Sequence, residues 1–97
     1  MKPYCPKKWH IFFKAIHDNQ RQMILEIIRN HREIHANGIV EKISLSQPTV
    51  SHHLKILCDA NLLHVKKSGK EMLYSINKEC IGECCGGFMR KFMDKTS

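Results

Sequence analysis

Apolar residues in the first third of the chain recur with the spacing of helices that bury one face. In residues 7–17 they follow the i, i+3, i+4, i+7 pattern and are Trp9, Phe12, Phe13 and Ile16. Asp18 is placed to cap a second helix that runs to about residue 30. We expect its inner face to hold Ile24, Leu25, Ile27 and Ile28, and its outer face Arg21, Gln22 and Arg29. The pattern predicts two helices, preceded by an arm over residues 1–6.

The middle of the chain predicts a short helix, a tight turn and a longer helix. Asn37-Gly38 interrupts the periodicity, and the apolar residues Ile39, Val40 and Ile43 then support a short third helix. Residues 44–46 form the turn, and Ser46 can cap the next helix. Pro48 is tolerated in its first turn because those N–H groups lack intrahelical partners. The buried face of this helix is Val50, Leu54, Leu57 and Cys58, and Asn61 stands at a left-handed C-terminal cap.

The last third of the chain changes period from helix to strand and back. Residues 62–76 predict two short strands around the turn Ser68-Gly69-Lys70. From Lys78 a helical stripe returns, although three glycines weaken it. The stripe is Ile81, Cys84, Cys85, Phe88, Met89, Phe92 and Met93. The sequence predicts a mainly α fold of about five helices with a small β-hairpin, in one domain over residues 1–97.

A short helix, a turn, a polar-tipped helix and a basic hairpin follow one another in the order of a winged helix-turn-helix. The helix-turn-helix covers residues 36–60, the wing residues 62–76 and the C-terminal helix residues 78–95. In this fold the second helix of the motif enters the DNA major groove. With Val50 facing the core, about 100° per residue places Ser51, His52 and Lys55 outward, and Gln47 and Thr49 lie at the tip.

The outward residues have the chemistry of DNA recognition. Gln47 can bond an adenine edge in two places, hydroxyl groups can reach bases or phosphates, and His52 and Lys55 can meet phosphate or guanine. Lysines at the hairpin turn can follow the DNA backbone or probe the minor groove. The predicted set is Ser46, Gln47, Thr49, Ser51, His52 and Lys55 on the helix, and Lys66, Lys67 and Lys70 on the wing. The alternatives are polar residues that only cap the helix, and lysines that only keep the hairpin soluble.

The adjacent residues His52 and His53 do not form one site. Neighbours on a helix point about 100° apart, so the pair lacks the shared face that helical metal ligands or an acid-base couple require. His52 faces the groove, whereas His53 lies on the flank of the core. We expect His53 to be packed and hydrogen-bonded.

The net charge and the composition limit the kinds of partner that the protein is expected to bind. Sixteen Lys and Arg against nine Asp and Glu give a net charge of +7, which suits nucleic acid. No apolar run approaches the ~18 residues of a spanning helix and no signal peptide is evident, so we expect a cytoplasmic protein with no membrane partner. No Ser/His/Asp set, glycine-rich phosphate loop or carboxylate pair indicates an enzyme.

Three segments resemble the ArsR-type (arsenical-resistance-repressor-like) winged-helix transcription regulators in order and spacing. They are DNQRQMILEII at 18–28, LSQPTVSHHLKIL at 45–57 and GKEMLYSI at 69–76. The resemblance implies a homodimer, joined through the first and last helices, that binds a pseudo-palindromic operator on double-stranded DNA and represses until an inducer releases it. It also implies that the predicted helix and wing residues face the operator. Many members have arginine where His52 stands, so binding here would be mildly pH-sensitive.

The terminal helices also carry the most aromatic faces, with Trp9, Phe12 and Phe13 on one and Phe88 and Phe92 on the other. Such faces suit a subunit seam, although a core within one chain would use the same pattern. The resemblance favours the seam.

The sequence does not identify the inducer, and several kinds of site are possible. Metal-sensing members often carry a Cys-x-Cys before the turn, where this chain has His35, Ala36 and Asn37. A metal or As(III) could instead bind at Cys80, Cys84 and Cys85, with Cys5 or a dimer partner completing a soft site. The same thiols could sense oxidation, or only pack as small apolar residues. His31 and His35 would be i, i+4 neighbours and could bind a metal if the second helix continued that far, but the break near residue 37 weakens this, and the alternative is ordinary surface histidines. The alternative function is a metal-binding or protein-interaction module that does not depend on DNA.

Overall fold

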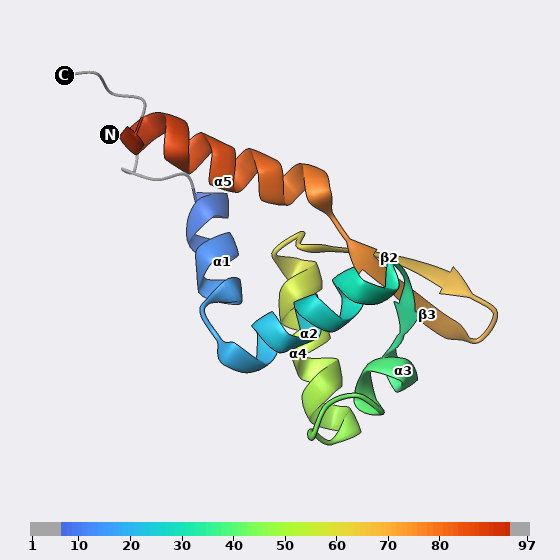
Figure 1. Ribbon diagram of the computed structural model, residues 1–97. Helices are drawn as coiled ribbons and strands as arrows, with labels where there is room; N and C mark the ends of the chain where they lie inside the picture. Colours follow the sequence, from blue (N-terminus) through green and yellow to red (C-terminus); the bar gives the residue numbers. More distant parts are fainter. Residues whose placement is uncertain (1–6, 94–97) are drawn as a thin grey trace.

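Five helices and three strands make up residues 7–93, the part of the chain that the computed structural model describes (Figure 1). In chain order they are α1 (Lys7–Ile16), α2 (Asn19–His31), β1 (Ile34–His35), α3 (Ala36–Val40), α4 (Gln47–Asp59), β2 (Leu63–Ser68), β3 (Glu71–Ile76) and α5 (Lys78–Met93). The strands form an antiparallel sheet in the order β1-β3-β2. The mainly α architecture with a β-hairpin is therefore confirmed.

Helix α2 begins where the sequence predicts, but one of its side chains points inward instead of outward. The Asp18 carboxylate accepts a hydrogen bond from the Arg21 N–H at 2.9 Å, as expected of a cap. The Arg21 side chain is only 13% exposed and donates to the carbonyl oxygens of Ala15 at 2.5 Å and Lys14 at 3.4 Å. The outward prediction for Arg21 is wrong, because its guanidinium satisfies carbonyl groups that the end of α1 leaves without intrahelical partners.

Strand β1 was not predicted, and it changes the start of the helix-turn-helix. Ile34 pairs with Tyr74 of β3, so two residues before α3 join the hairpin to form the sheet. Helix α3 begins at Ala36 and contains Asn37 and Gly38, so the predicted interruption there is wrong. A Cβ atom on Gly38 would lie 2.9 Å from Ile34 Cγ1. The glycine is therefore needed for close packing of α3 against β1.

The predicted signals around α4 and the hairpin are confirmed. Ser46 caps α4 and Pro48 lies in the first turn. Asn61 has a φ of 61° after the helix, and Gly69 has a φ of 65° in the hairpin turn. Strands β2 and β3 pair from Leu63 opposite Ile76 to Ser68 opposite Glu71. Local capping and turn chemistry therefore fix this half of the fold.

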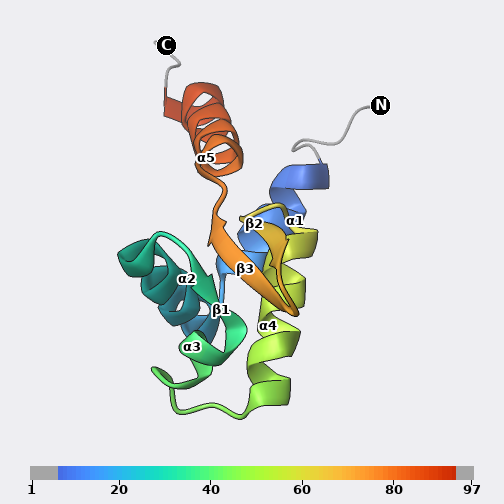
Figure 2. The ribbon, with the colours of Figure 1, turned by 90° about the vertical axis from the view of Figure 1, so that its right-hand side faces the viewer.

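The buried core lies where α1, α2, α3 and α4 meet the sheet. Its fully buried side chains are Phe12, Ile24, Ile28, Ile39, Val50, Leu57, Leu62 and Cys84. Helix α5 projects from this body and crosses α1 (Figures 1 and 2). Cys84 attaches α5 to the core, and Gly87 lies so close to the Trp9 ring that an added Cβ would be 2.7 Å from Trp9 Cζ2. Lys8 of α1 and Glu83 of α5 form an exposed ion pair across the same contact.

Candidate nucleic-acid interface

The N-terminal tip of α4 is held in place by its own side chains. The Ser46 Oγ accepts a hydrogen bond from the Thr49 N–H at 3.3 Å and lies 2.8 Å from the Thr49 hydroxyl. Thr49 is half-buried, so its hydroxyl is engaged in the cap and less available to a base than its position in sequence indicates. Gln47 is exposed and its Nε2 donates to Asn37 Oδ1 of α3 at 3.4 Å. Asn37 orients Gln47, a role that the sequence did not reveal.

The outer face of α4 presents the predicted polar groups to solvent. Ser51, His52 and Lys55 are exposed, while Val50, Leu54 and Leu57 are buried on the opposite face. The helix carries no carboxylate until Asp59, which lies 3.1 Å from Lys55 Nζ in an exposed ion pair. An anion that approaches the first turns of α4 therefore meets polar groups, a cation and free helix N–H groups without opposing charge.

His53 is a buried structural histidine, as expected. It is 6% exposed, its Nε2 lies 3.0 Å from Gln20 Oε1, and its Nδ1 lies 3.3 Å from Arg21 Nη1. A guanidinium can only donate, so Nδ1 is the acceptor and Nε2 carries the proton of a neutral ring. Burial lowers the pKa of His53, with Arg21 adding to the effect against the opposing charge of Asp18. His53 thus ties α4 to α2 while His52 faces outward.

The β2–β3 hairpin presents lysines at its turn. Lys66, Lys67 and Lys70 are all exposed. Lys66 Nζ forms an exposed ion pair with Glu33 at 3.1 Å, whereas Lys67 and Lys70 form no ion pair within residues 7–93. Figure 1 shows the hairpin reaching away from the helices, on the side of the molecule opposite α1. The two lysines at the turn can therefore meet a polyanion without first losing a partner.

The cysteines of the described residues are buried or half-buried, and Cys80 lies beside Cys84. Cys84 is 1% exposed, and burial followed by the neighbouring Cys80 raises the pKa of its thiol to about 11. Cys80 and Cys85 are half-buried, and Cys5 lies outside the described residues. Among residues 7–93 no three His, Cys, Asp or Glu side chains are grouped to hold a metal ion. The soft-metal or redox site stays a prediction, and a buried thiol with a raised pKa does not favour it.

The two histidines that precede the helix-turn-helix belong to different elements of the fold. Helix α2 ends at His31, whose Nδ1 lies 2.8 Å from the Ile27 carbonyl oxygen, while His35 belongs to β1. They are therefore not neighbours on one helix.

Within residues 7–93 no helix is both long and apolar enough to cross a membrane.

Comparisons with known proteins agree with this geometry. The family model described as "Bacterial regulatory protein, arsR family" matches residues 18–65, from the cap of α2 into β2. The chain is 32% identical over 83 residues to the transcriptional repressor SdpR of Bacillus subtilis (strain 168), which covers 86% of this chain and 90% of the relative. It is 34% identical to an arsenical resistance operon repressor of Staphylococcus xylosus, over 75% of this chain and 69% of the relative.

A solved structure shows the same fold. The ArsR-like transcriptional regulator from Rhodococcus sp. RHA1 superposes with a TM-score of 0.81 at 20% identity, over 90% of this chain and 81% of that one. Because the match covers 90% of the chain, it cannot be confined to the elements from α2 to β3 (residues 18–76). It therefore includes at least part of α1 or α5 as well.

Proposed function

The chain belongs to the ArsR family of bacterial regulatory proteins and is a DNA-binding transcriptional regulator, and from this premise we propose that it is a dimeric repressor. In this proposal α4 lies in the major groove of a pseudo-palindromic operator and the β2–β3 hairpin contacts the flanking backbone. The relatives that are named as repressors support the sign of regulation. A cytoplasmic location belongs to the same proposal, since that is where the operator is.

The observation that carries the proposal is the exposed, carboxylate-free first half of α4. We assign base recognition to Gln47, because its amide is exposed and Asn37 already restrains it. Ser51, His52 and Lys55 contact bases or phosphates, and Ser46 and Thr49 present the capped helix end to a phosphate. Lys66, Lys67 and Lys70 bind the DNA backbone without reading sequence.

The dimer would form through α1 and α5, where apolar side chains remain exposed. Ile11 is 42% exposed, Phe88 38% and Met89 54%. Part of the aromatic set already pairs within the chain, since the rings of Phe13 and Phe88 lie 5.2 Å apart. The exposed remainder supports a subunit seam, because a lone protein rarely leaves such a patch open to water.

The DNA-binding proposal is tested by selection and variants. A pool of random duplexes is enriched on the purified protein, and fluorescence anisotropy then measures Kd for the enriched and a scrambled site at several salt concentrations. We expect a dyad-symmetric site, with Gln47→Ala reducing the preference for it and Lys67→Gln weakening both duplexes alike. Asn30→Ala, at an exposed position of α2, is the control and should change neither. No enrichment over random duplex would contradict the proposal.

The dimer is tested separately by sedimentation. Met89→Lys places a charge in the proposed seam, whereas Met23→Lys places one at a similarly exposed position of α2. We expect the first variant to shift the mass toward the monomer and the second to leave it unchanged. A monomeric wild-type protein at micromolar concentration would refute the seam.

A further inference from the structure

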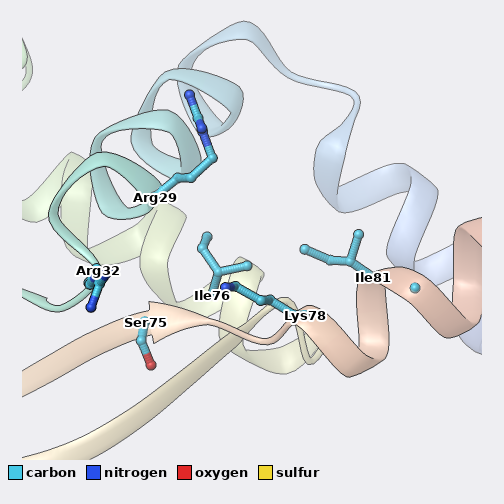
Figure 3. A pocket seen from close by; sticks show the side chains of 7 residues that line it. Arg29, Arg32, Ser75, Ile76, Lys78 and Ile81 are labelled. Carbon is cyan, nitrogen blue, oxygen red and sulfur yellow. The ribbon is translucent and has the colours of Figure 1, made fainter.

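A pocket of about 850 Å³ lies between the end of α2, the end of β3 and the start of α5 (Figure 3). Its walls are partly apolar and partly cationic, and they are formed by Arg29, Arg32, Ser75, Ile76, Lys78, Ile81 and Gly82. Figure 3 shows Ile76 and Ile81 extending toward one another from the strand and the helix. This volume is in the range of sites that hold small organic ligands. None of the predicted DNA-binding residues and none of the described cysteines lines this pocket.

The charge of the pocket is positive and largely uncompensated. Arg29 is paired with Glu26, whose Oε2 lies 2.6 Å from Arg29 Nη2. Arg32 and Lys78 form no ion pair in the described part of the chain, and no carboxylate lines the pocket. Lys78 is also the first residue of α5, although Asn77 Oδ1 caps this helix end at the Cys80 N–H and Glu79 lies in the same turn. Two cations with no carboxylate partner indicate an anionic ligand.

The backbone at Arg32 holds this arginine in an unusual conformation. Its φ is 63° and its ψ is −59°, and the Glu33 N–H donates to the His31 carbonyl oxygen at 2.6 Å across it. This is a γ-turn with positive φ, which is rare and strained for a residue with a side chain. Glycine would adopt it more readily. The turn holds a guanidinium at the rim of the pocket where a residue without a side chain would fit the backbone better.

We propose that this pocket binds a small organic anion, a carboxylate or phosphate group attached to an apolar body. Arg32 and Lys78 hold the anionic group, and the apolar body lies between Ile76 and Ile81. Guanidinium and carboxylate or phosphate form paired hydrogen bonds, which gives the site its preference for these groups. The apolar side chains give affinity that grows with the buried surface of the ligand.

The position of the pocket gives the ligand a route to the DNA-binding elements. Residue 77 alone separates β3, which is half of the wing, from α5. A ligand that bridges α2, β3 and α5 would fix the wing relative to α5 and change DNA affinity, provided that it binds the two arrangements unequally. This regulatory step rests on the proposed function, whereas the binding step does not.

Binding is tested without DNA by isothermal titration calorimetry on the full chain with four probes. The probes are octanoate, octyl phosphate, 1-octanol and inorganic phosphate. We expect one of the first two to bind at least about tenfold more tightly than both octanol and inorganic phosphate, because each of those lacks half of the ligand. If octanol binds as well as octanoate and octyl phosphate, or if no probe binds, the pocket is not an organic-anion site. The stronger of the first two probes distinguishes a carboxylate from a phosphate source.

Variants locate the binding. Arg32→Gly removes the guanidinium and suits a φ of 63°, so we expect the thermal midpoint to be kept while affinity for the tighter probe falls about tenfold. Lys78→Gln should also weaken that probe. Lys42→Gln removes one exposed positive charge outside the pocket and serves as the matched control. Equal losses in Lys42→Gln and Arg32→Gly, or no loss in Arg32→Gly, would overturn the assignment.

The regulatory step has its own readout. The Kd for the enriched duplex is measured with and without the tighter probe, in the wild type and in Arg32→Gly. A change in wild-type Kd that is absent from Arg32→Gly supports regulation through the pocket. Calorimetric binding with an unchanged Kd would refute the regulatory step alone, and failure to bind any duplex would count against the proposed function and leave the pocket intact.

Discussion

Arg21 joins three helices, and its removal should lower the stability of the whole fold. The guanidinium donates to the Ala15 carbonyl at the end of α1 and to His53 Nδ1 of α4 at 3.3 Å, and it lies 3.9 Å from the Asp18 cap. A hydrogen bond with a charged partner contributes roughly 1.5–3 kcal/mol. Two such bonds at the lower end of that range give about 3 kcal/mol for Arg21→Ala, because the side chain keeps a little solvent exposure.

Thermal denaturation followed by circular dichroism measures this loss. For a domain of this size about 3 kcal/mol corresponds to a fall of roughly 12–24 °C in the unfolding midpoint. All variants are compared at one protein concentration, because a dimer makes the midpoint depend on concentration. Arg29→Ala is the control, since Arg29 forms only an exposed ion pair on the same helix and its loss should change the midpoint little. If the unfolding midpoint of Arg21→Ala is no lower than that of Arg29→Ala, Arg21 does not join the helices.

Three further outcomes follow from single residues. Burial lowers the pKa of His53, so an unfolded chain takes up a proton near pH 6.5 that the native ring takes up only at lower pH. The free energy of unfolding, measured by urea titration, should therefore fall as the pH drops from about 7 to 5. His53→Gln should flatten that dependence. Gly82→Ala should raise the thermal unfolding midpoint through helix propensity. Gly87→Ala should lower the midpoint, because its added Cβ would meet Trp9. A shift of the midpoint in the same direction in both variants would contradict the contact between Gly87 and Trp9. His52→Arg should tighten DNA binding at pH 8 and steepen its salt dependence by about one phosphate contact. Fluorescence anisotropy measures both. If neither the affinity nor the salt dependence changes, His52 does not belong to the interface.

The parts of the fold that could be predicted are those set by short stretches of sequence. Asp18, Ser46 and Pro48 mark helix starts through their own chemistry, and Asn61 marks a helix end. The missed features depend on residues that are distant in sequence. Strand β1 exists because β3, forty residues further on, supplies its hydrogen bonds. Capping signals are local, whereas strand pairing is not.

The candidate site follows the same division. Helical periodicity correctly placed His52 outward and His53 at the core. It placed Arg21 outward as well, because period alone does not show the unsatisfied carbonyl groups of the preceding helix. The hydrogen bond between Asn37 and Gln47 and the cationic pocket also require the folded chain. Arg32 and Lys78 are 46 positions apart in the sequence and line one pocket only in the folded chain.

The central claim is that α4 and the β2–β3 hairpin form the DNA-binding surface. Its most direct test is an NMR titration of 15N-labelled protein with the enriched duplex. We predict that the largest amide shift changes fall on residues 47–55 and on residues 66–70, and that the residues around Arg32 change less. The largest changes on α1 or on the pocket, with α4 unaffected, would contradict the claim.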